Sequence, residues 1–238
     1  MTTTVILDTV PSTTAVGTIV SKARLILIDP DGVRWSDSEL VGWLSDAERA
    51  TVMAIPSASS VVYTSPLIAG TRQTIPLKGY MLLSLKRNIA ANELSAGRAI
   101  RVVSQELMDA FNPDWHTATA DPVVQNYMFD PQDSKSFLVF PPNDGTGKVE
   151  MIYSVYPAPK SLLTELIEVA DIYQTALLNY ILSRAYQKDG DFTTGMALAN
   201  NYLQLFTMAL GATEQGSLGN NPNLGQGNFN PAAKGSAK

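Results

Sequence analysis

The first quarter of the chain places apolar and polar residues with the period of an α-helix. In residues 18–28 apolar side chains recur every three or four positions, and polar ones occupy the opposite side. A turn-forming Asp-Pro-Asp-Gly sequence follows at residues 29–32, and Ser36 to Glu39 then have the form of a capping box. The pattern therefore predicts a helix over residues 18–28 and a second one that starts at this capping box and ends at Pro56.

From residue 59 to about residue 156 the pattern changes to the short period of β-strands. Stretches rich in Val, Ile, Tyr and Phe alternate with clusters of Pro, Gly, Asn and Asp. The predicted strands cover residues 61–64, 72–75, 80–89, 99–103, 137–140 and 148–156. Because the last two flank the turn-forming residues 143–147, we expect them to form a hairpin. A short helix is expected at residues 104–111.

Two further helices are predicted near the C-terminus. The third helix of the body opens at Thr164, with acidic residues in its first turns and basic residues in its last, before Gly190. The fourth covers about residues 193–210, with Gly211 as its stop. Its apolar side chains fill more than half of the helix circumference, which is more than one core contact requires. Either this helix is fully internal, or it is covered on one side by its own domain and on the other by something else.

These elements predict an α+β fold in one body with two flexible ends. Residues 1–14 are expected to be an extended arm, and residues 15–212 the body, in which helices from 15–55 and 162–211 pack with an antiparallel sheet or small barrel from 59–157. Residues 213–238 are rich in Gly, Asn and Ser and contain too few apolar residues to order themselves.

Composition excludes several classes of function. The 238 residues, 45% of them hydrophobic, suffice for a core, and no apolar run is long enough to span a membrane. A formal charge of -5 argues against tight binding to nucleic acid. The absence of cysteine excludes disulfides, thiolate catalysis and cysteine-based metal sites. No secretory signal is apparent at the start, so we expect a cytoplasmic product or one that leaves by a route needing no signal.

No catalytic, cofactor-binding or metal-binding residues are predicted. His116 is the single histidine and has no Gly-x-Ser-x-Gly nucleophile motif beside it, so it is interpreted as structural or interfacial. Residues 29–32 lack the spacing of a calcium loop, and residues 145–148 lack the first glycine of a phosphate-binding loop. A pair of carboxylates for glycoside hydrolysis stays open, since its geometry is not visible in a sequence.

Among the tryptophans, Trp43 lies on the apolar side of its helix and is assigned to the core. Trp35 and Trp115 stand beside turn residues and are candidates for an interface or a stacking platform.

Three groups of residues resemble head-to-tail adaptor proteins of tailed, especially short-tailed, bacteriophages. They are GVRWSDSEL at 32–40 with WLSDAER at 43–49, GRAIR at 97–101 with NPDWH at 112–116, and ADIY at 170–173 with LLNY at 177–180 and RAYQKD at 184–189. The resemblance covers about residues 19–211. It implies a structural virion protein, made in the host cytoplasm, which forms a ring of twelve copies between the capsid portal and a tail or nozzle protein. DNA would pass through the ring without sequence-specific binding.

The ring hypothesis leads to a set of candidate interface residues, drawn from the turns, the fourth helix and the tail. They are Trp35, Trp115, His116, Tyr202, Phe206, Leu218, Leu224 and Phe229. Two alternatives remain: a carbohydrate-acting hydrolase that uses two carboxylates, and a monomeric binding module in which Trp35 and Trp115 form an aromatic platform.

Overall fold

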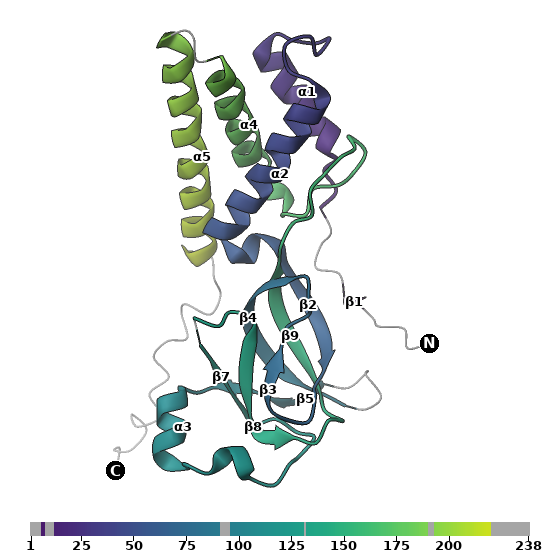
Figure 1. Cartoon of the computed structure of the whole chain (residues 1–238), viewed down its shortest axis with the longest axis vertical. Helices are drawn as coiled ribbons and strands as arrows, with labels where there is room; N and C mark the ends of the chain where they lie inside the picture. Colours follow the sequence, from purple (N-terminus) through teal and green to yellow (C-terminus); the bar gives the residue numbers. More distant parts are fainter. Residues whose placement is uncertain (1–5, 8–11, 91–95, 131, 190–192, 220–238) are drawn as a thin grey trace, which may run out of the picture.

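The computed structural model describes residues 6–7, 12–90, 96–130, 132–189 and 193–219. A group of helices occupies one end of an elongated molecule, and two β-sheets with a short helix occupy the other (Figure 1). The α+β class predicted from the sequence is confirmed.

The first two helices form where the sequence predicts them. Helix α1 spans Val16–Leu27 and α2 spans Asp37–Ala54. The capping box is present: the Ser36 hydroxyl accepts a hydrogen bond from the Glu39 amide, and the Ser36 amide donates to the Glu39 carboxylate. Between the helices, the Asp29 carboxylate accepts from three successive backbone amides, those of residues 33–35. Asp29 therefore organises the predicted turn.

Four helices pack side by side around one apolar core. Helix α4, Gln174–Lys188, contacts α1 and α2 on one side and α5, Thr193–Gly219, on the other (Figure 1). The core contains Ile19 of α1, Leu44 of α2 and Leu177 of α4, all fully buried.

The prediction that the third helix of the body opens at Thr164 is wrong. Helix α4 begins at Gln174, after the 3-10 turn η3, Asp171–Tyr173. Residues 163–167 run beside the start of α1 instead, and the amides of Val16 and Ile167 donate across this contact to Glu165 and Thr14. In this non-helical conformation Ile167 and Val169 are both buried. These tertiary contacts outweigh the local preference for a helix.

Gly211 does not stop the fourth predicted helix. Helix α5 continues through it to Gly219, so residues 213–219 of the predicted tail are helical. A glycine inside a helix costs only about 1 kcal/mol relative to alanine, which is too little to end a helix whose Phe206 and Leu210 are buried beside it. The rest of the predicted tail, residues 220–238, lies outside the described residues.

The β-rich part consists of two sheets rather than one. The first has the strand order β1-β2-β9-β4-β5, and the second has the order β3-β8-β7-β6. All pairs are antiparallel except β6 with β7. The strands are β1 (Ile6–Leu7), β2 (Ser60–Pro66), β3 (Gly70–Thr74), β4 (Gly79–Ile89), β5 (Ala96–Ala99), β6 (Arg101–Val102), β7 (Asn126–Phe129), β8 (Ser136–Asn143) and β9 (Lys148–Val155).

The predicted hairpin of residues 137–140 with 148–156 is wrong, because β8 and β9 belong to different sheets. The Asn143 side chain holds the intervening loop: its oxygen accepts from the Gly145 and Gly147 amides, and its nitrogen donates to the carbonyls of residues 121 and 122. The chain thus crosses from one sheet to the other. Phe137 of β8 and Met151 of β9 then meet in the same core cluster.

The remaining predictions for this region are partly met. Helix α3, Gln105–Phe111, forms with Ser104 as its N-cap, as expected for residues 104–111. The strand expected at residues 99–103 is divided between β5 and β6 at the buried Ile100. Strand β7 was not predicted. Part of the N-terminal arm pairs with the body, since β1 is antiparallel to β2.

Candidate assembly surfaces and the junction cleft

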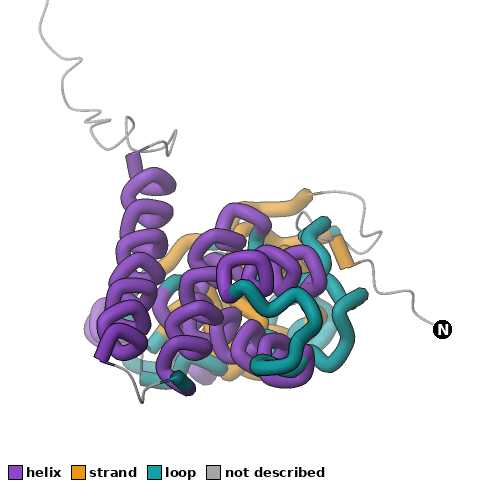
Figure 2. Tube along the Cα trace, turned by 90° about the horizontal axis from the view of Figure 1, so that it is seen from above, coloured by secondary structure: helices purple, strands orange, loops and turns teal. Residues whose placement is uncertain are grey.

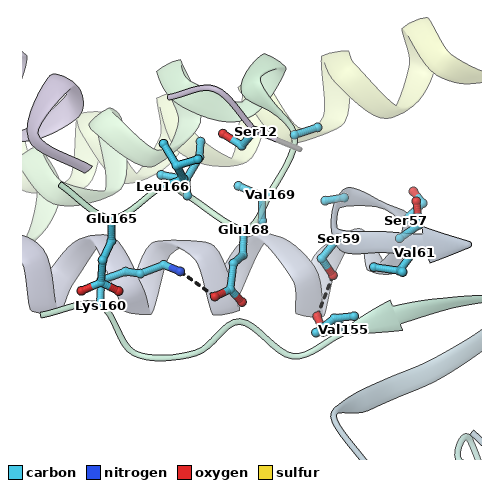
Figure 3. Close-up of a pocket in the computed structure, with 14 residues that line it drawn as sticks. Ser12, Ser57, Ser59, Val61, Val155, Lys160, Glu165, Leu166, Glu168 and Val169 are labelled. Atoms are coloured by element: carbon cyan, nitrogen blue, oxygen red, sulfur yellow. Dashed lines mark hydrogen bonds and ion pairs between the residues drawn. The ribbon is translucent and has the colours of Figure 1, made fainter. Parts of the chain in front are cut away.

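A cleft of about 650 Å³ lies where the helices meet the sheets (Figure 3). On its walls, Lys160 Nζ and Glu168 Oε1 form an ion pair at 2.6 Å, and the Ser59 hydroxyl donates to the Val155 carbonyl at 2.7 Å. Serine hydroxyls and aliphatic side chains supply most of the lining. The lining residues are Ser12, Ser57, Ala58, Ser59, Ser60, Val61, Val155, Lys160, Glu165, Leu166, Ile167, Glu168, Val169 and Ala170.

A fully buried carboxyl group, that of Glu48 on α2, lies next to these residues. Its Oε1 accepts from the Glu168 amide at 2.5 Å, whereas its Oε2 has no hydrogen-bond partner in the described part of the chain. Burial raises the pKa of Glu48 to about 7, because it disfavours the charged form. One turn earlier on α2, the Ser45 hydroxyl accepts from the Lys160 amide at 2.9 Å. Ser45 and Glu48 therefore fasten the segment of residues 160–168 to α2.

The other two carboxylates of the cleft also hold this segment. Glu165 Oε1 accepts from the amides of Ser161 and Leu162, at 2.9 and 2.7 Å, and these bonds lower the pKa of Glu165. Glu168 is engaged by Lys160. Within the described residues, no group of three or more His, Asp or Glu side chains is placed to hold a metal ion. The carboxyl groups of the cleft thus bind amides and the lysine of the chain itself.

Helix α5 has one covered side and one open side. On the covered side, Phe206 meets Tyr180 of α4 edge to face, with ring centroids 5.3 Å apart, and Tyr202 stacks on Tyr186 at 5.7 Å. On the open side Leu205 and Met208 are exposed, and 68% of Met208 is accessible to solvent. The two views of the molecule agree that α5 lies at one edge of the bundle (Figures 1 and 2).

From Thr193 to Thr213, the open side of α5 carries polar residues such as Asn201 and Gln204 but no charge. No Asp, Glu, Lys, Arg or His occurs from Thr193 to Thr213. Solvent-facing sides of helices in globular proteins normally carry charged and polar residues. The chain by itself thus leaves one side of α5 uncovered, and the alternative of a fully internal helix is contradicted for the single chain.

A known protein family matches this chain over almost the whole of the fold described above. The family model described as SU10 adaptor protein matches residues 14–225, from the start of the bundle to beyond α5. This chain belongs to the SU10 adaptor protein family. Its members are structural adaptors of bacteriophages, so this adaptor is a virion component that contacts other head or tail proteins. No curated protein matches the chain.

In this adaptor the two candidate tryptophans are buried at opposite ends of the molecule. The Trp35 indole N–H donates to the Ala185 carbonyl at 3.3 Å, and the Trp115 indole donates to the Asp109 carboxylate at 2.8 Å. An aromatic platform requires both rings on one exposed face. Trp35 and Trp115 therefore do not form the exposed platform that the binding-module alternative requires.

The other candidate interface residues occupy different environments. The His116 ring stacks on Trp115 at 3.7 Å, and its Nδ1 hydrogen-bonds the Thr71 hydroxyl at 2.9 Å. Tyr202 and Phe206 lie on the covered side of α5, where they contact α4. Leu218 is part of the last turn of α5, and Leu224 and Phe229 lie outside the described residues.

Sequence reasoning missed apolar residues exposed in connecting segments. Ile28 and Val33 are exposed in the loop between α1 and α2, and Leu162 is exposed before α4. In α3, 81% of Phe111 is accessible. The sequence signal that could have identified these exposed residues is an apolar residue within an otherwise turn-forming or polar stretch.

No helix within the described ranges is long and apolar enough to cross a membrane.

Proposed function

We propose that this adaptor forms a ring of twelve copies that joins the capsid portal to the tail and leaves a channel for DNA. Residues 15–212, the predicted body, are the unit of the ring. The observation that carries the proposal is the uncharged, exposed side of α5, in a chain that belongs to a family of phage adaptors. Large apolar side chains exposed on such an uncharged surface, here Leu205 and Met208, are typical of contact sites between proteins.

The two ends of the elongated molecule support a joining role. The loop between α1 and α2, at one end, exposes Ile28 and Val33 (Figure 1). At the other end, α3 exposes Leu107 and Phe111, which are four residues apart and share one side of the helix. A protein that connects two partners needs a contact surface for each. We infer that one of these ends contacts the portal and the other contacts the tail or nozzle protein.

The charge of the chain suits a channel through which DNA moves. Each copy has a formal charge of -5, so a ring of copies repels the phosphate backbone. Such a wall allows DNA to slide instead of holding it.

The experiment is native mass spectrometry of the adaptor, alone and mixed with the portal protein of the same phage. The proposal predicts a complex with twelve adaptor copies on the portal, whether or not the adaptor forms a ring alone. A portal protein from an unrelated phage is the control and should give no such complex. An adaptor that remains monomeric and does not bind its own portal would contradict the proposal.

A further inference from the structure

A second exposed apolar surface lies on the side of the bundle opposite to α5. Residues 161–167, here called the leucine loop, expose Leu162, Leu163 and Leu166, and 60% of Leu162 is accessible. In Figure 1 the loop is the green segment at the right edge, whereas α5 is at the left edge. The view from above also shows α5 and this loop at opposite edges of the bundle (Figure 2).

The leucine loop is held firmly in place. The Leu163 carbonyl accepts from the Gly17 amide at 2.8 Å, which fixes the loop to the first turn of α1. Its other end is fixed by the Ile167 amide, which donates to Thr14 at 3.0 Å. Because the backbone is already ordered, the exposed leucines would lose little conformational entropy on binding a partner.

The charges in and beside the leucine loop are already engaged within the chain. Lys160, whose side chain is almost fully buried, is paired with Glu168, and the Glu165 carboxylate accepts two backbone amides. A partner that covers the leucines therefore needs no charge of its own. A charged partner surface would lose hydration there and find no counterion.

The open side of α5 meets this requirement. It is uncharged from Thr193 to Thr213, and Leu205 and Met208 lie one turn apart on its exposed side. Two different patches on opposite edges of one subunit produce a head-to-tail contact, which repeats from copy to copy and closes into a ring when the rotation permits. A two-fold dimer would use the same patch twice.

We propose that the open side of α5 in one copy packs against the leucine loop of the next copy. This contact rests on the proposed ring and assigns its two surfaces. Leu205 and Met208 of one subunit cover Leu162 and Leu163 of its neighbour. The occupant of each surface is thus a second copy of this chain.

Disulfide cross-linking tests the pairing directly, because the chain has no cysteine of its own. One cysteine is placed on α5, as Leu205→Cys or Met208→Cys, and one on the loop, as Leu162→Cys or Leu163→Cys, which gives four double variants. Rings assembled on the portal and then oxidised should yield a ladder of linked species, up to the full ring, for at least one pair. The matched control combines Met208→Cys with Val33→Cys, an exposed position in the loop between α1 and α2, and should yield no ladder.

The outcome separates this pairing from the ring itself. If native mass spectrometry shows rings and none of the four pairs forms a ladder, the pairing is overturned while the proposed function stands. If no ring forms with the wild-type chain, the proposed function fails first.

Charge substitution provides an independent test on the full chain. Met208→Asp and Leu163→Lys should each reduce the fraction of adaptor in rings at least tenfold, and the double variant, which places opposite charges across the contact, should recover part of that loss. Met53→Asp is the control, since Met53 of α2 is equally exposed, at 66%, and lies outside both patches. Unchanged circular dichroism shows that the variants fold. Full assembly of both single variants would overturn the pairing.

Discussion

Glu48 is a carboxyl group that the fold buries in the contact between α2 and the segment of residues 160–168. It accepts the Glu168 amide, and Lys160 and Glu168 are the charged groups that most affect it from that segment. Burial dominates and raises the pKa of Glu48 to about 7. The folded protein thus binds a proton there at pH values at which an unfolded glutamate has already lost it.

This shift predicts that stability falls as pH rises. Between the ordinary glutamate pKa of 4.5 and about 7, the folded state holds more protons than the unfolded state, so each step upward in pH favours unfolding. Above pH 7 this loss of stability is complete, and it lowers the free energy of unfolding by about 3 kcal/mol at most. Glu48→Gln cannot ionise and keeps an oxygen that accepts the Glu168 amide, so this variant should show a smaller change of stability with pH.

Urea unfolding at pH 5 and pH 8 measures this effect. The wild-type chain should lose free energy of unfolding between the two, and Glu48→Gln should lose less. Glu106→Gln, at an exposed position on α3, is the control and should behave as wild type. Equal losses in wild type and Glu48→Gln would contradict the assignment of the pH dependence to Glu48.

Asp171 fastens the end of the N-terminal arm to the bundle. Its carboxylate accepts from the hydroxyls of Ser12 and Thr13 and from the amides of Thr13 and Thr14. The Ser12 hydroxyl is the largest cause of a pKa well below the usual range for aspartate. Asp171→Ala should therefore free this segment. Limited proteolysis should then cleave before α1 several times faster than in wild type, whereas Asp31→Ala, in the exposed loop after α1, should leave that rate unchanged.

Among the helices, α5 shows how an unfavourable residue is tolerated inside a long element. A Cβ added at Gly211 meets no atom within 4 Å, so Gly211→Ala should stabilise the chain by about 0.5–1 kcal/mol. The contrasting site is Gly17 of α1, where an added Cβ would lie 3.1 Å from the Leu163 carbonyl oxygen. Gly17→Ala should yield a smaller gain or a loss. Thermal unfolding of both variants checks the difference, and an equal gain at both sites would contradict the close approach of the leucine loop to α1.

Elements with local signals could be predicted from the sequence, whereas elements fixed by distant contacts could not. The capping box at Ser36 and the N-cap at Ser104 act within three residues, and both helices begin there. The position at which α4 starts depends on backbone hydrogen bonds between the preceding segment and residues 14–17. The predicted hairpin does not form, because the Asn143 side chain binds the carbonyls of residues 121 and 122 and holds the loop between the two sheets. None of these long-range contacts leaves a periodic pattern in the sequence.

The candidate surfaces also divide into those with a local signal in the sequence and those that only tertiary contacts define. The broad apolar circumference of α5 is a periodic signal, and the structure shows that part of it is exposed. The leucine loop has no period, so only the structure reveals that it lies opposite to α5 (Figure 2). Trp35 and Trp115 stand beside turn residues in the sequence, but tertiary packing buries both rings.

For the whole molecule, exposed apolar surfaces lie at both edges and both ends. The edges carry α5 and the leucine loop, and the ends carry the α1–α2 loop and α3. This arrangement is suited to a subunit that binds copies of itself sideways and different partners above and below. A solitary molecule would leave all four surfaces in water, which costs solubility.

Electron cryomicroscopy of the intact phage particle tests this account most directly. We predict a closed ring of adaptor subunits between the portal and the tail, with α5 of each copy against the leucine loop of the next and DNA on the axis. Density at the junction that contains no adaptor, or adaptor copies that do not touch one another, would contradict the account.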